Sequence, residues 1–518
     1  MNLGRYIRRT AGHQPDAEAV VCGTSRLTYA ELDDHSDRLA VALRGLGLRQ
    51  GERVATLAGN RAELVVTEIA LYKTGLVRVP INARLGAHEV SHLLRESDAR
   101  VLLTDAAHLE DVRVAMPDTG TKAVISYDGP SSLGPAYLDM LSGNAPEPVD
   151  VECAEGDAAV LHFTSGSTGK LKAAIQTYGN RLALLRKMVM SADTRVGPGD
   201  KKILAGPVTH ASGMPLLGIF FTGGCAVILP RWDPEEFLAT IQRERATHAF
   251  VVPTMVNSVL ARPGARTYDT SSLRQLIYGA APMSAQRIRE AWEFFGPVLS
   301  QGYGCGETTS GVLFLSTDDH RRAIEGEDEE LLLSCGRPLA EAEVAILDED
   351  GTPLPDGEIG EIAVRGPDVV PGYLGAPDLT AATFRDGWFL TGDLARRRAD
   401  GYVFIVDRKK DMIVSGGFNI YAVEVESVLH QHPDVYEAAV VGVPDEQWGE
   451  AVKAVVVPRE GATPAESDLV DFCGDRLARM KKPRSVDFVA ALPHNPNGKI
   501  DRRAIRDHYW AGAERRVN

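Results

Sequence analysis

Leu161-His-Phe-Thr-Ser-Gly-Ser-Thr-Gly-Lys-Leu-Lys-Ala-Ala174 is a segment in which an apolar run meets a glycine-rich loop. Residues 158–163 are typical of a strand end, and hydroxyl residues, glycines and lysines follow at once. Glycines let the backbone approach an anion closely, successive N–H groups form an anion-binding concavity, and lysines offset negative charge. The segment is therefore a candidate triphosphate-binding loop.

The segment differs from the P-loop of nucleoside triphosphatases. No glycine stands five residues before Gly169, and Leu171 occupies the position where that motif has Ser or Thr. A flexible Gly/Ser-rich turn is the alternative interpretation, and spacing alone does not separate the two. The remainder of the chain decides between them.

Composition limits the class of protein. The 518 residues allow several domains, and 44% apolar and 25% charged residues are typical of a globular protein. A net charge of −15 argues against nucleic acid or an anionic membrane as a general partner. The six cysteines form no CxxC pair, the histidines show no HExxH spacing, and no secretory signal or membrane span is visible. We expect a cytoplasmic protein with reduced thiols.

Helices and strands alternate through the first half of the chain. A capping box at 28–31 opens a helix, and strands are expected near 53–57, 76–80 and 101–104 with helices between them. This alternation predicts layered α/β subdomains with parallel strands. Later strands end at Gly, Ser, Thr or Glu residues, and ligands of such sheets gather at strand carboxyl ends.

The second half changes character. From 344 to 370 the apolar period becomes two, which predicts a small antiparallel, barrel-like part, and the charged segment 318–330 is expected to be an exposed loop. The charge cluster 407–411, which we expect not to be buried, indicates a domain boundary. We therefore assign a large domain to residues 1–407, a connection to 408–411 and a small, mobile α+β domain to 412–518.

Motifs along the whole chain then identify a resemblance. They are Phe163-Thr-Ser-Gly-Ser-Thr-Gly-Lys-Leu-Lys172, Pro207-Val-Thr-His-Ala-Ser-Gly213, Tyr278-Gly-Ala-Ala-Pro282, Gln301-Gly-Tyr-Gly-Cys-Gly-Glu-Thr308, Gly360-Glu-Ile-Ala-Val-Arg-Gly366, Gly387-Trp-Phe-Leu-Thr-Gly-Asp393, Asp407-Arg-Lys-Lys-Asp-Met-Ile-Val-Ser-Gly-Gly417 and Asn495-Pro-Asn-Gly-Lys499. In this order they resemble the adenylate-forming superfamily, and most closely its acyl-CoA synthetases. The resemblance implies that a carboxylate attacks the α-phosphate of ATP, with Mg²⁺ present, and that a thiol, usually of CoA, then takes the acyl group.

The resemblance also implies residue roles in the first step. Lys499 bridges the carboxylate and the α-phosphate, Glu307 binds Mg²⁺ together with Thr168, and His210 lies beside the reacting acid. Tyr303 stacks on adenine, Asp393 holds the ribose and Arg408 assists at the ribose or phosphate. The further nucleotide-binding residues are Thr164, Ser165, Gly166, Ser167, Gly169, Lys172, Gly279, Ala280, Ala281, Gln301, Gly302 and Gly304.

For the second step, the resemblance implies that the small domain rotates about Lys410. Gly416 and Gly417 would line the pantetheine tunnel, and Trp448 and Lys482 match positions that contact the CoA nucleotide in some members, although a packing tryptophan and a solvated lysine fit the sequence equally well. The acyl pocket is assigned to residues that are mostly apolar: His210, Gly213, Met214, Val252, Thr254, Met255, Tyr278 and Met283.

The substrate is expected to be a hydrophobic carboxylic acid. Near residue 233 the sequence is typical of a helix start in acyl-CoA ligases, and the Asp that holds an amino acid's amine in peptide synthetases is absent. A fatty, aryl or terpenoid acid of natural-product metabolism fits, and a homodimer is possible in this family. Since no carrier domain follows Asn518, a free-standing acyl-CoA synthetase is favoured over an enzyme that loads a carrier protein, and over a non-catalytic binding relative.

Several positions depart from the superfamily pattern. Gly306 stands where a Thr usually contacts the α-phosphate, and this departure motivates the non-catalytic alternative. The other departures are Ala173 for Gly, Tyr178 for His, Phe418 for Glu and Ala422 for Pro. Lys499, Glu307 and Asp393 are all present, so we expect a working enzyme.

Overall fold

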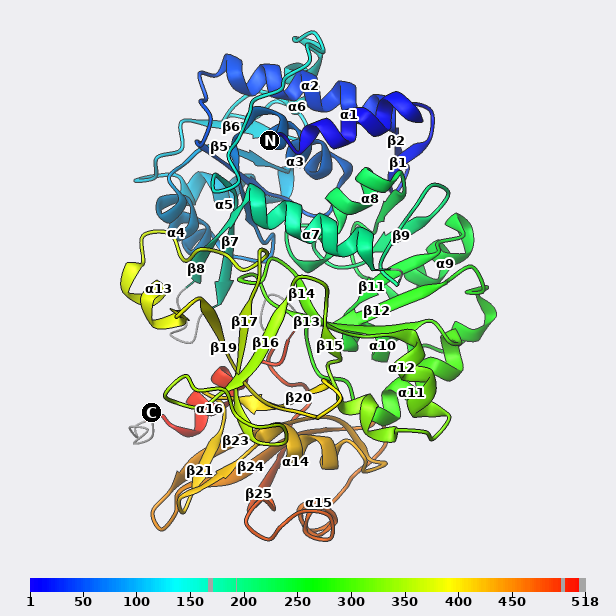
Figure 1. Cartoon of the computed structure of the whole chain (residues 1–518), viewed down its shortest axis with the longest axis vertical. Coiled ribbons are helices and arrows are strands. Elements are labelled where there is room, and N and C mark those ends of the chain that lie inside the picture. Colours follow the sequence, from blue (N-terminus) through cyan, green and yellow to red (C-terminus); the bar gives the residue numbers. More distant parts are fainter. Residues whose placement is uncertain (166–170, 192, 495–498, 512–518) are drawn as a thin grey trace.

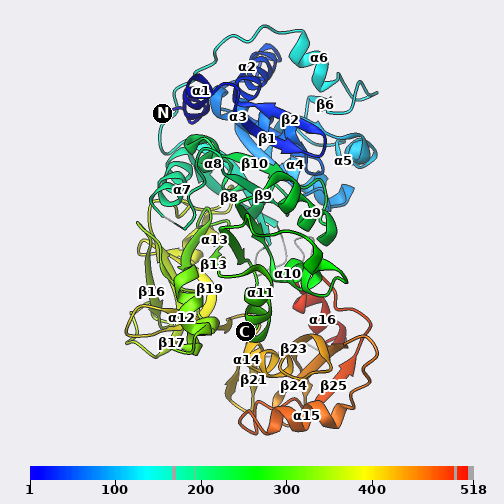
Figure 2. The same ribbon diagram turned by 90° about the vertical axis from the view of Figure 1, so that its right-hand side faces the viewer.

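The computed structural model describes residues 1–165, 171–191, 193–494 and 499–511. The chain forms a large domain and, beneath it, a small C-terminal domain (Figures 1 and 2). The predicted fold class, a large layered α/β domain followed by a smaller α+β domain, is confirmed. Over the described ranges, every helix is too short or too polar to cross a membrane.

A six-stranded sheet with the order β6-β5-β3-β4-β7-β8 forms one half of the large domain, and only β8 is antiparallel to its neighbour. Its strands are β3 (Arg53–Leu57), β4 (Val77–Ile81), β5 (Ala99–Thr104), β6 (Ala123–Ser126), β7 (Ala158–Ser165) and β8 (Leu171–Thr177). The glycine-rich segment thus links β7 to β8, with Thr164 opposite Lys172. Residues 166–170 between them lie outside the described residues.

A nine-stranded sheet with the order β15-β14-β13-β12-β11-β9-β10-β1-β2 forms the other half. Its central strands β1, β10, β9, β11, β12 and β13 are parallel, and the strands at both edges are antiparallel. The strands are β1 (Glu18–Cys22), β2 (Ser25–Thr28), β9 (Lys201–Leu204), β10 (Cys225–Ile228), β11 (His248–Val251), β12 (Gln275–Gly279), β13 (Leu299–Gly304), β14 (Gly311–Leu315) and β15 (Arg337–Pro338).

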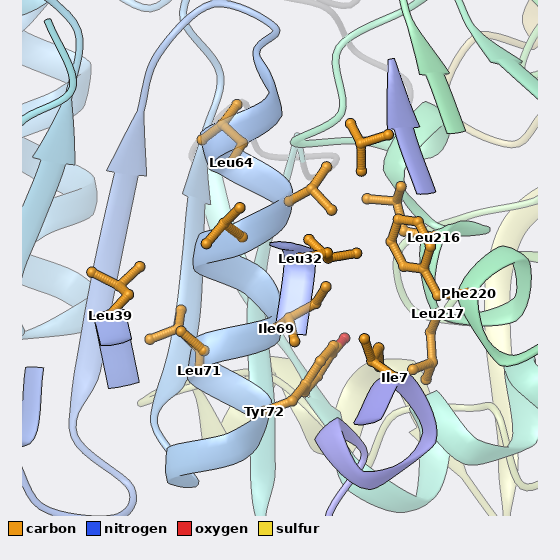
Figure 3. Packing of buried hydrophobic residues seen from close by; sticks show 14 of the residues in the cluster. Ile7, Leu32, Leu39, Leu64, Ile69, Leu71, Tyr72, Leu216, Leu217 and Phe220 are labelled. Atoms are coloured by element: carbon orange, nitrogen blue, oxygen red, sulfur yellow. The ribbon is translucent and has the colours of Figure 1, made fainter. Parts of the chain in front are cut away.

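The largest core lies between the two sheets. Helix α3 (Ala62–Thr74) is buried at every residue except Glu63, and its buried charged residues Glu68 and Lys73 are held in ion pairs. Figure 3 shows its side chains packed against those of α8 (Leu216–Thr222) and of Ile7. The other helices of this layer are α1 (Gly4–His13), α2 (Tyr29–Gly45), α6 (Tyr137–Ser142) and α7 (Tyr178–Met190).

Further helices cover the outer faces of the sheets. On the nine-stranded sheet these are α9 (Pro234–Glu244), α10 (Pro253–Leu260), α11 (Ala285–Phe295) and α12 (Thr317–Ile324), and on the six-stranded sheet they are α4 (Ala87–Ser97) and α5 (Leu109–Ala115). Single 3₁₀ turns lie at Ala106–His108, Ala211–Gly213, Ala265–Thr267 and Glu329–Leu333. The large domain is therefore built of five alternating layers.

An antiparallel five-stranded sheet completes the large domain, as the period of two predicts. It contains β16 (Glu343–Leu347), β17 (Ile359–Arg365), β18 (Phe384–Arg385), β19 (Trp388–Arg397) and β20 (Val403–Arg408), with α13 (Pro377–Thr383). The small domain contains β21 (Ile413–Ser415), β22 (Phe418–Ile420), α14 (Ala422–Leu429), β23 (Val435–Asp445), β24 (Gly449–Pro458), α15 (Glu466–Gly474), β25 (Ser485–Phe488) and α16 (Arg502–Tyr509).

The prediction of an exposed loop at 318–330 is wrong up to Ile324, which ends helix α12 (Thr317–Ile324), whereas residues 325–330 are mostly exposed. Helix α12 begins there with a capping box in which the Ser316 hydroxyl accepts from the Asp319 N–H and the Asp319 carboxylate accepts from the Ser316 N–H. His320 is fully buried, and its Nε2 lies 2.9 Å from the Tyr278 hydroxyl. The charged composition hid this helix because only its outer face is solvated.

Lys73 tests the packing between α2 and α3. Its fully buried ammonium lies 2.6 Å from Asp33 and 2.9 Å from Asp37. We expect Lys73→Ala to lower the free energy of unfolding by about 3 kcal/mol, because it removes a buried cation from the buried Asp37 and the half-buried Asp33 and leaves Arg8 as their remaining partner. Arg113→Ala, which breaks the exposed ion pair with Glu110, should change it by less than about 1 kcal/mol. Chemical denaturation measures both, and equal effects would contradict this assignment.

Candidate active site

Glu307, at the carboxyl end of β13, lies where the three sheets of the large domain meet. Its side chain is 7% exposed, and its Oε1 accepts hydrogen bonds from the Thr164 hydroxyl of β7 and the Tyr373 hydroxyl, both at 2.9 Å. Lys172 of β8 donates to the Tyr373 hydroxyl at 3.0 Å, and burial lowers the pKa of this lysine. The predicted metal ligand and the described ends of the phosphate loop are thus adjacent.

The residues assigned to the nucleoside form a second group. The Tyr303 hydroxyl donates to Asp393 Oδ2 at 2.6 Å, and Arg408 Nε lies 3.2 Å from Asp393 Oδ1. Gly279 and Gly302 are neighbours across β12 and β13. Ala280, in the turn after β12, has φ +67°, a conformation that costs a non-glycine residue about 1–3 kcal/mol and is concentrated at functional sites.

Lys499 belongs to the same place. It lies within electrostatic reach of Arg408, Asp393 and Cys305, and the pKa of its ammonium is lowered to about 8, mainly by burial and then by Arg408. The structure therefore brings Lys499 of the small domain to the nucleoside group. The other loop residues assigned by sequence, Gly166, Ser167, Thr168 and Gly169, lie outside the described residues.

Two histidines, one from a strand of the six-stranded sheet and one from a loop of the other half, face each other beside this lysine. The rings of His162 in β7 and His210 in the loop after β9 are 5.1 Å apart in an edge-to-face arrangement. Burial lowers the pKa of His210 to about 4, with Arg78 and Lys499 adding to the effect, and burial holds the pKa of His162 well below 6.5. Both imidazoles are therefore neutral near pH 7.

His162 explains the glycine at position 306. A Cβ on Gly306 would lie 2.6 Å from His162 Cδ2 and 2.6 Å from Thr164 Cγ2, so no larger residue fits without movement. Sequence reasoning missed His162, although a histidine inside an apolar strand end was a visible signal. It also missed Tyr373, which lies in an irregular segment and becomes recognisable only through its bond to Glu307.

The residues assigned to the acyl pocket do not all come together. Met255 lies close to Gly206, in the turn that leads from β9 to His210, since its Cε is 3.9 Å from a Cβ built on this glycine. Gly213 leaves no room for a side chain, because a Cβ there would lie 1.9 Å from the Val208 carbonyl oxygen. Thr254 is exposed, Val252 is half-buried, and Met283 packs on the outer core. Tyr278 faces that same outer core, bonded to His320, and Met214 Sδ accepts from Arg181 at 3.3 Å.

The residues assigned to CoA lie in the small domain. Gly416 and Gly417 have φ +58° and +81°, and a Cβ on Gly416 would lie 2.4 Å from the Trp448 indole. Lys482 Nζ is 3.9 Å from Asp471 of α15. Figure 1 shows β21 and β24, which carry these glycines and the tryptophan at their ends, in the small domain below the large one.

The segment around Lys410 differs from expectation in one respect. Lys410 is exposed in a turn, but Asp407 of the same charge cluster is 1% exposed. The Asp407 Oδ2 accepts a hydrogen bond from the Ala422 N–H at 2.5 Å. This bond connects a residue before the turn at Lys410 to a residue after it. A proline at 422 has no N–H to donate, which accounts for the alanine there. Burial raises the pKa of Asp407 to about 7.

Comparisons with known proteins agree with this geometry. Residues 7–374 match the family model of the AMP-binding enzymes, and residues 424–499 match the model of the AMP-binding enzyme C-terminal domain, so the chain belongs to this adenylate-forming family. It is 39% identical over 509 residues to a feruloyl-CoA synthase of an Amycolatopsis species, covering 98% of this chain and 99% of the relative.

Two other similarities are informative. A fatty acid–[acyl-carrier-protein] ligase, ScoC, of Streptomyces coeruleorubidus is 35% identical over 517 residues, covering 98% of this chain and 96% of ScoC. The structure of the amide bond synthetase McbA from Marinactinospora thermotolerans superposes with a TM-score of 0.89 at 34% identity, covering 98% and 99% of the two chains. The predicted class of enzyme, an acyl-CoA synthetase that uses ATP and CoA, is confirmed by the family and its relatives.

Position 306 gives a direct test of the packing beside His162. We expect Gly306→Ala to lower the free energy of unfolding by about 1–3 kcal/mol, because the new methyl group overpacks a filled space. Adding His162→Ala should recover part of that loss. The matched control is Gly302→Ala, whose Cβ would meet only Ile277 Cγ2 at 4.0 Å. If the two single variants are equally stable in urea, His162 does not fill the space.

Proposed function

We propose that this acyl-CoA ligase activates a hydrophobic carboxylic acid through the residues around Lys499. The observation that carries the proposal is the placement of Lys499, from the small domain, beside Asp393 and Arg408 of the large domain. In the first step a carboxylate oxygen forms a bond to the α-phosphorus, and the bond to pyrophosphate breaks. Both reactants are anions, so the Lys499 cation stabilises the charge that grows on the α-phosphate.

Glu307 is the proposed Mg²⁺ ligand, with Thr168 and phosphate oxygens completing the set. The fit rests on a buried carboxylate beside the phosphate loop, and Mg²⁺ is usually held by one or two carboxylates plus phosphates and water. When bound, the ion would neutralise charge on the phosphates. The chain's own contribution is to orient the carboxylate with the Thr164 and Tyr373 hydroxyls and to hold Lys172 near the phosphates.

Tyr303 and the turn at Gly279 to Ala281 would hold adenine. The neighbouring residues of β13, Gln301, Gly302 and Gly304, would lie beside the adenine ring. Asp393 would accept hydrogen bonds from the ribose hydroxyls. These bonds would partly replace the hydrogen bond that Asp393 accepts from the Tyr303 hydroxyl. His210, neutral at pH 7, would hydrogen-bond to the acid without repelling Lys499. Ser165 and the loop glycines would donate backbone N–H groups to the phosphates.

In the second step the small domain is proposed to rotate about Lys410. The thiol then attacks the acyl carbon, the bond to AMP breaks, and a thioester forms. Gly416 and Gly417 would admit the pantetheine arm, with Trp448 and Lys482 near the CoA nucleotide. On this basis we assign one domain to residues 1–407 and the second to residues 412–518. We place the reaction in the cytoplasm, where ATP and CoA are supplied. A homodimer is compatible with this scheme.

The acceptor thiol has one alternative. ScoC, by its name, uses an acyl-carrier protein, so a carrier pantetheine is the second candidate. ATP–pyrophosphate exchange across fatty, aryl and terpenoid acids, followed by mass spectrometry with CoA or with a carrier protein, tests both. A thioester only on the carrier protein would replace the CoA proposal. Absence of exchange with every acid, or a preference for amino acids, would refute the acid specificity.

The pKa of Lys499 predicts the pH dependence of the first step. Because that pKa is about 8 in the structure, the fraction of cationic Lys499 falls as pH rises through 8, and kcat/KM for ATP in pyrophosphate exchange should fall with it. Lys499→Arg should remove this basic limb, since arginine stays charged. Lys499→Ala should abolish exchange but spare thioester formation from a supplied acyl-adenylate. An unchanged profile in the arginine variant would contradict the assignment.

Lys410→Pro should separate the two half-reactions. Proline fixes φ near −65° and removes the N–H, so a backbone that must rotate at this position is held in one arrangement. Pyrophosphate release in a single turnover should stay near wild type, while transfer to CoA falls by orders of magnitude. Lys410→Ala, which leaves φ free, is the matched control and should change neither step. Intact thioester formation in the proline variant would exclude Lys410 as the pivot.

A further inference from the structure

His162 lies in the site without a role in the two proposed half-reactions. It is 6% exposed and stands in β7 two residues before Thr164, so both side chains lie on the same face of the strand. On that face the Thr164 hydroxyl donates to Glu307, and the His162 ring contacts the ring of His210. His162 therefore lies between the proposed metal ligand and the histidine assigned to the acid.

The ring of His162 carries a polar edge that the protein does not use. Among the described residues, neither of its nitrogen atoms has a hydrogen-bond partner. Burial, followed by the charges near it, holds its pKa well below 6.5, so the ring is neutral near pH 7 and has one N–H donor. Since a buried donor without an acceptor is costly, the missing partner indicates a ligand or bound water.

The edge that carries Nε2 faces Gly306, at the end of β13. A Cβ built on Gly306 would lie 2.6 Å from His162 Cδ2 and 3.4 Å from His162 Nε2. The φ of Gly306 is not left-handed, so the backbone there accepts a side chain, and only the imidazole and the Thr164 methyl group exclude one. The imidazole thus occupies the space into which a larger residue at 306 would point.

The surroundings of this ring are open to solvent although they lie deep in the protein. Cys305 is exposed, and Gly306, His210 and Lys499 are half-buried. Burial nevertheless raises the pKa of the Cys305 thiol and lowers the pKa of Lys499 to about 8. Groups that water reaches, but that most of their surroundings shield, line a recess. His162 forms part of its wall.

We propose that His162 is a catalytic residue of the first step, in which its Nε2–H donates a hydrogen bond to an oxygen of the α-phosphate. This inference rests on the proposed function and adds a residue to it. Glycine at 306 supplies no side-chain donor, and the imidazole supplies one from β7 instead. His162 transfers no proton: the carboxylate oxygen bonds to phosphorus, the bond to pyrophosphate breaks, and the imidazole stays neutral.

A neutral donor suits this position. The α-phosphate oxygens gain negative charge in the first step, and donors that are already in place stabilise this charge without rearranging. An anionic oxygen in front of Nε2 favours the tautomer that carries its hydrogen there. Arg78 and Arg181 help to keep the ring uncharged, so it does not add a repelling charge beside Lys499.

The experiment compares the binding of AMP and of adenosine by calorimetry, because only AMP carries the α-phosphate. His162→Leu, which is similar in size but has no donor, should weaken AMP binding about tenfold or more and leave adenosine binding unchanged. Its kcat in pyrophosphate exchange should fall about 100-fold or more. His162→Gln, whose amide nitrogen remains a donor, is the matched control and should retain most of both properties.

A second pair of variants moves the donor to the other strand. His162→Ala removes the ring and should also weaken AMP binding. Adding Gly306→Thr to it places a hydroxyl in the vacated space, and AMP binding should recover at least in part. Thermal unfolding of each variant checks that folded proteins are compared.

The outcomes separate this inference from the proposed function. Unchanged AMP binding in folded His162→Leu overturns the inference, even if exchange falls, because the donor would then serve the acid. An equal loss of adenosine binding, or an equal loss in His162→Gln, also overturns it, since both indicate packing. If His162→Leu does not fold, a double variant that binds AMP no better than His162→Ala refutes it.

The wild-type enzyme supplies the remaining outcomes. If it exchanges pyrophosphate with no acid, but prefers AMP to adenosine through His162, the proposed function fails and the inference stands. If it binds AMP no better than adenosine, the inference is refuted, whatever the exchange assay shows.

Discussion

The carboxylate of Glu307 is the interaction on which the arrangement of the large domain depends. A single oxygen accepts hydroxyl hydrogens from Thr164 of the six-stranded sheet and from Tyr373, which lies between β17 and β18 of the antiparallel sheet. The Glu307 backbone itself follows β13 of the nine-stranded sheet. Its carbonyl also accepts the Val370 N–H at 2.9 Å. Since an unpartnered buried carboxylate is costly, the three sheets are held in the one relation that satisfies it, which also sets the phosphate loop beside the adenine-side strands.

Behind this meeting point lies a buried cluster with an excess of positive charge. Glu68 is the anion, and Arg78 at 2.5 Å and Arg181 at 3.3 Å are its cations. Arg78 is among the charges that keep His162 and His210 neutral. The cluster therefore supplies a positive field at the site assigned to the reacting anions, while the nearby side chains of His162 and His210 remain uncharged. The field comes from buried, ion-paired arginines, which need not rearrange during the reaction.

Much of the architecture could be predicted from the chain alone, because periodicity and turn residues are local signals. The alternation near 53–104, the capping box at Thr28 and the antiparallel part all appear in the structure. The sequence did not predict to which face of a sheet a side chain points or how deeply it is buried. Tyr278 is one residue from the glycine turn yet points to the opposite face. His162 is recognisable only through its contact with His210, in the loop after β9, and the buried Asp407 carboxylate accepts a backbone N–H from a residue fifteen positions away. Each depends on strand register or on contacts that are distant in sequence.

The hydrogen bond from Ala422 to Asp407 has a thermodynamic consequence for the small domain. The carboxyl, with a pKa of about 7, lies before Lys410, and its donor lies after it. The proposed rotation about Lys410 would withdraw Ala422 and open this carboxyl to water, where its pKa would return toward about 3.9. The rotation would then release a proton, and rising pH would favour the rotated arrangement. Acidity would in that way shift the balance between the two proposed half-reactions through a group that touches neither substrate.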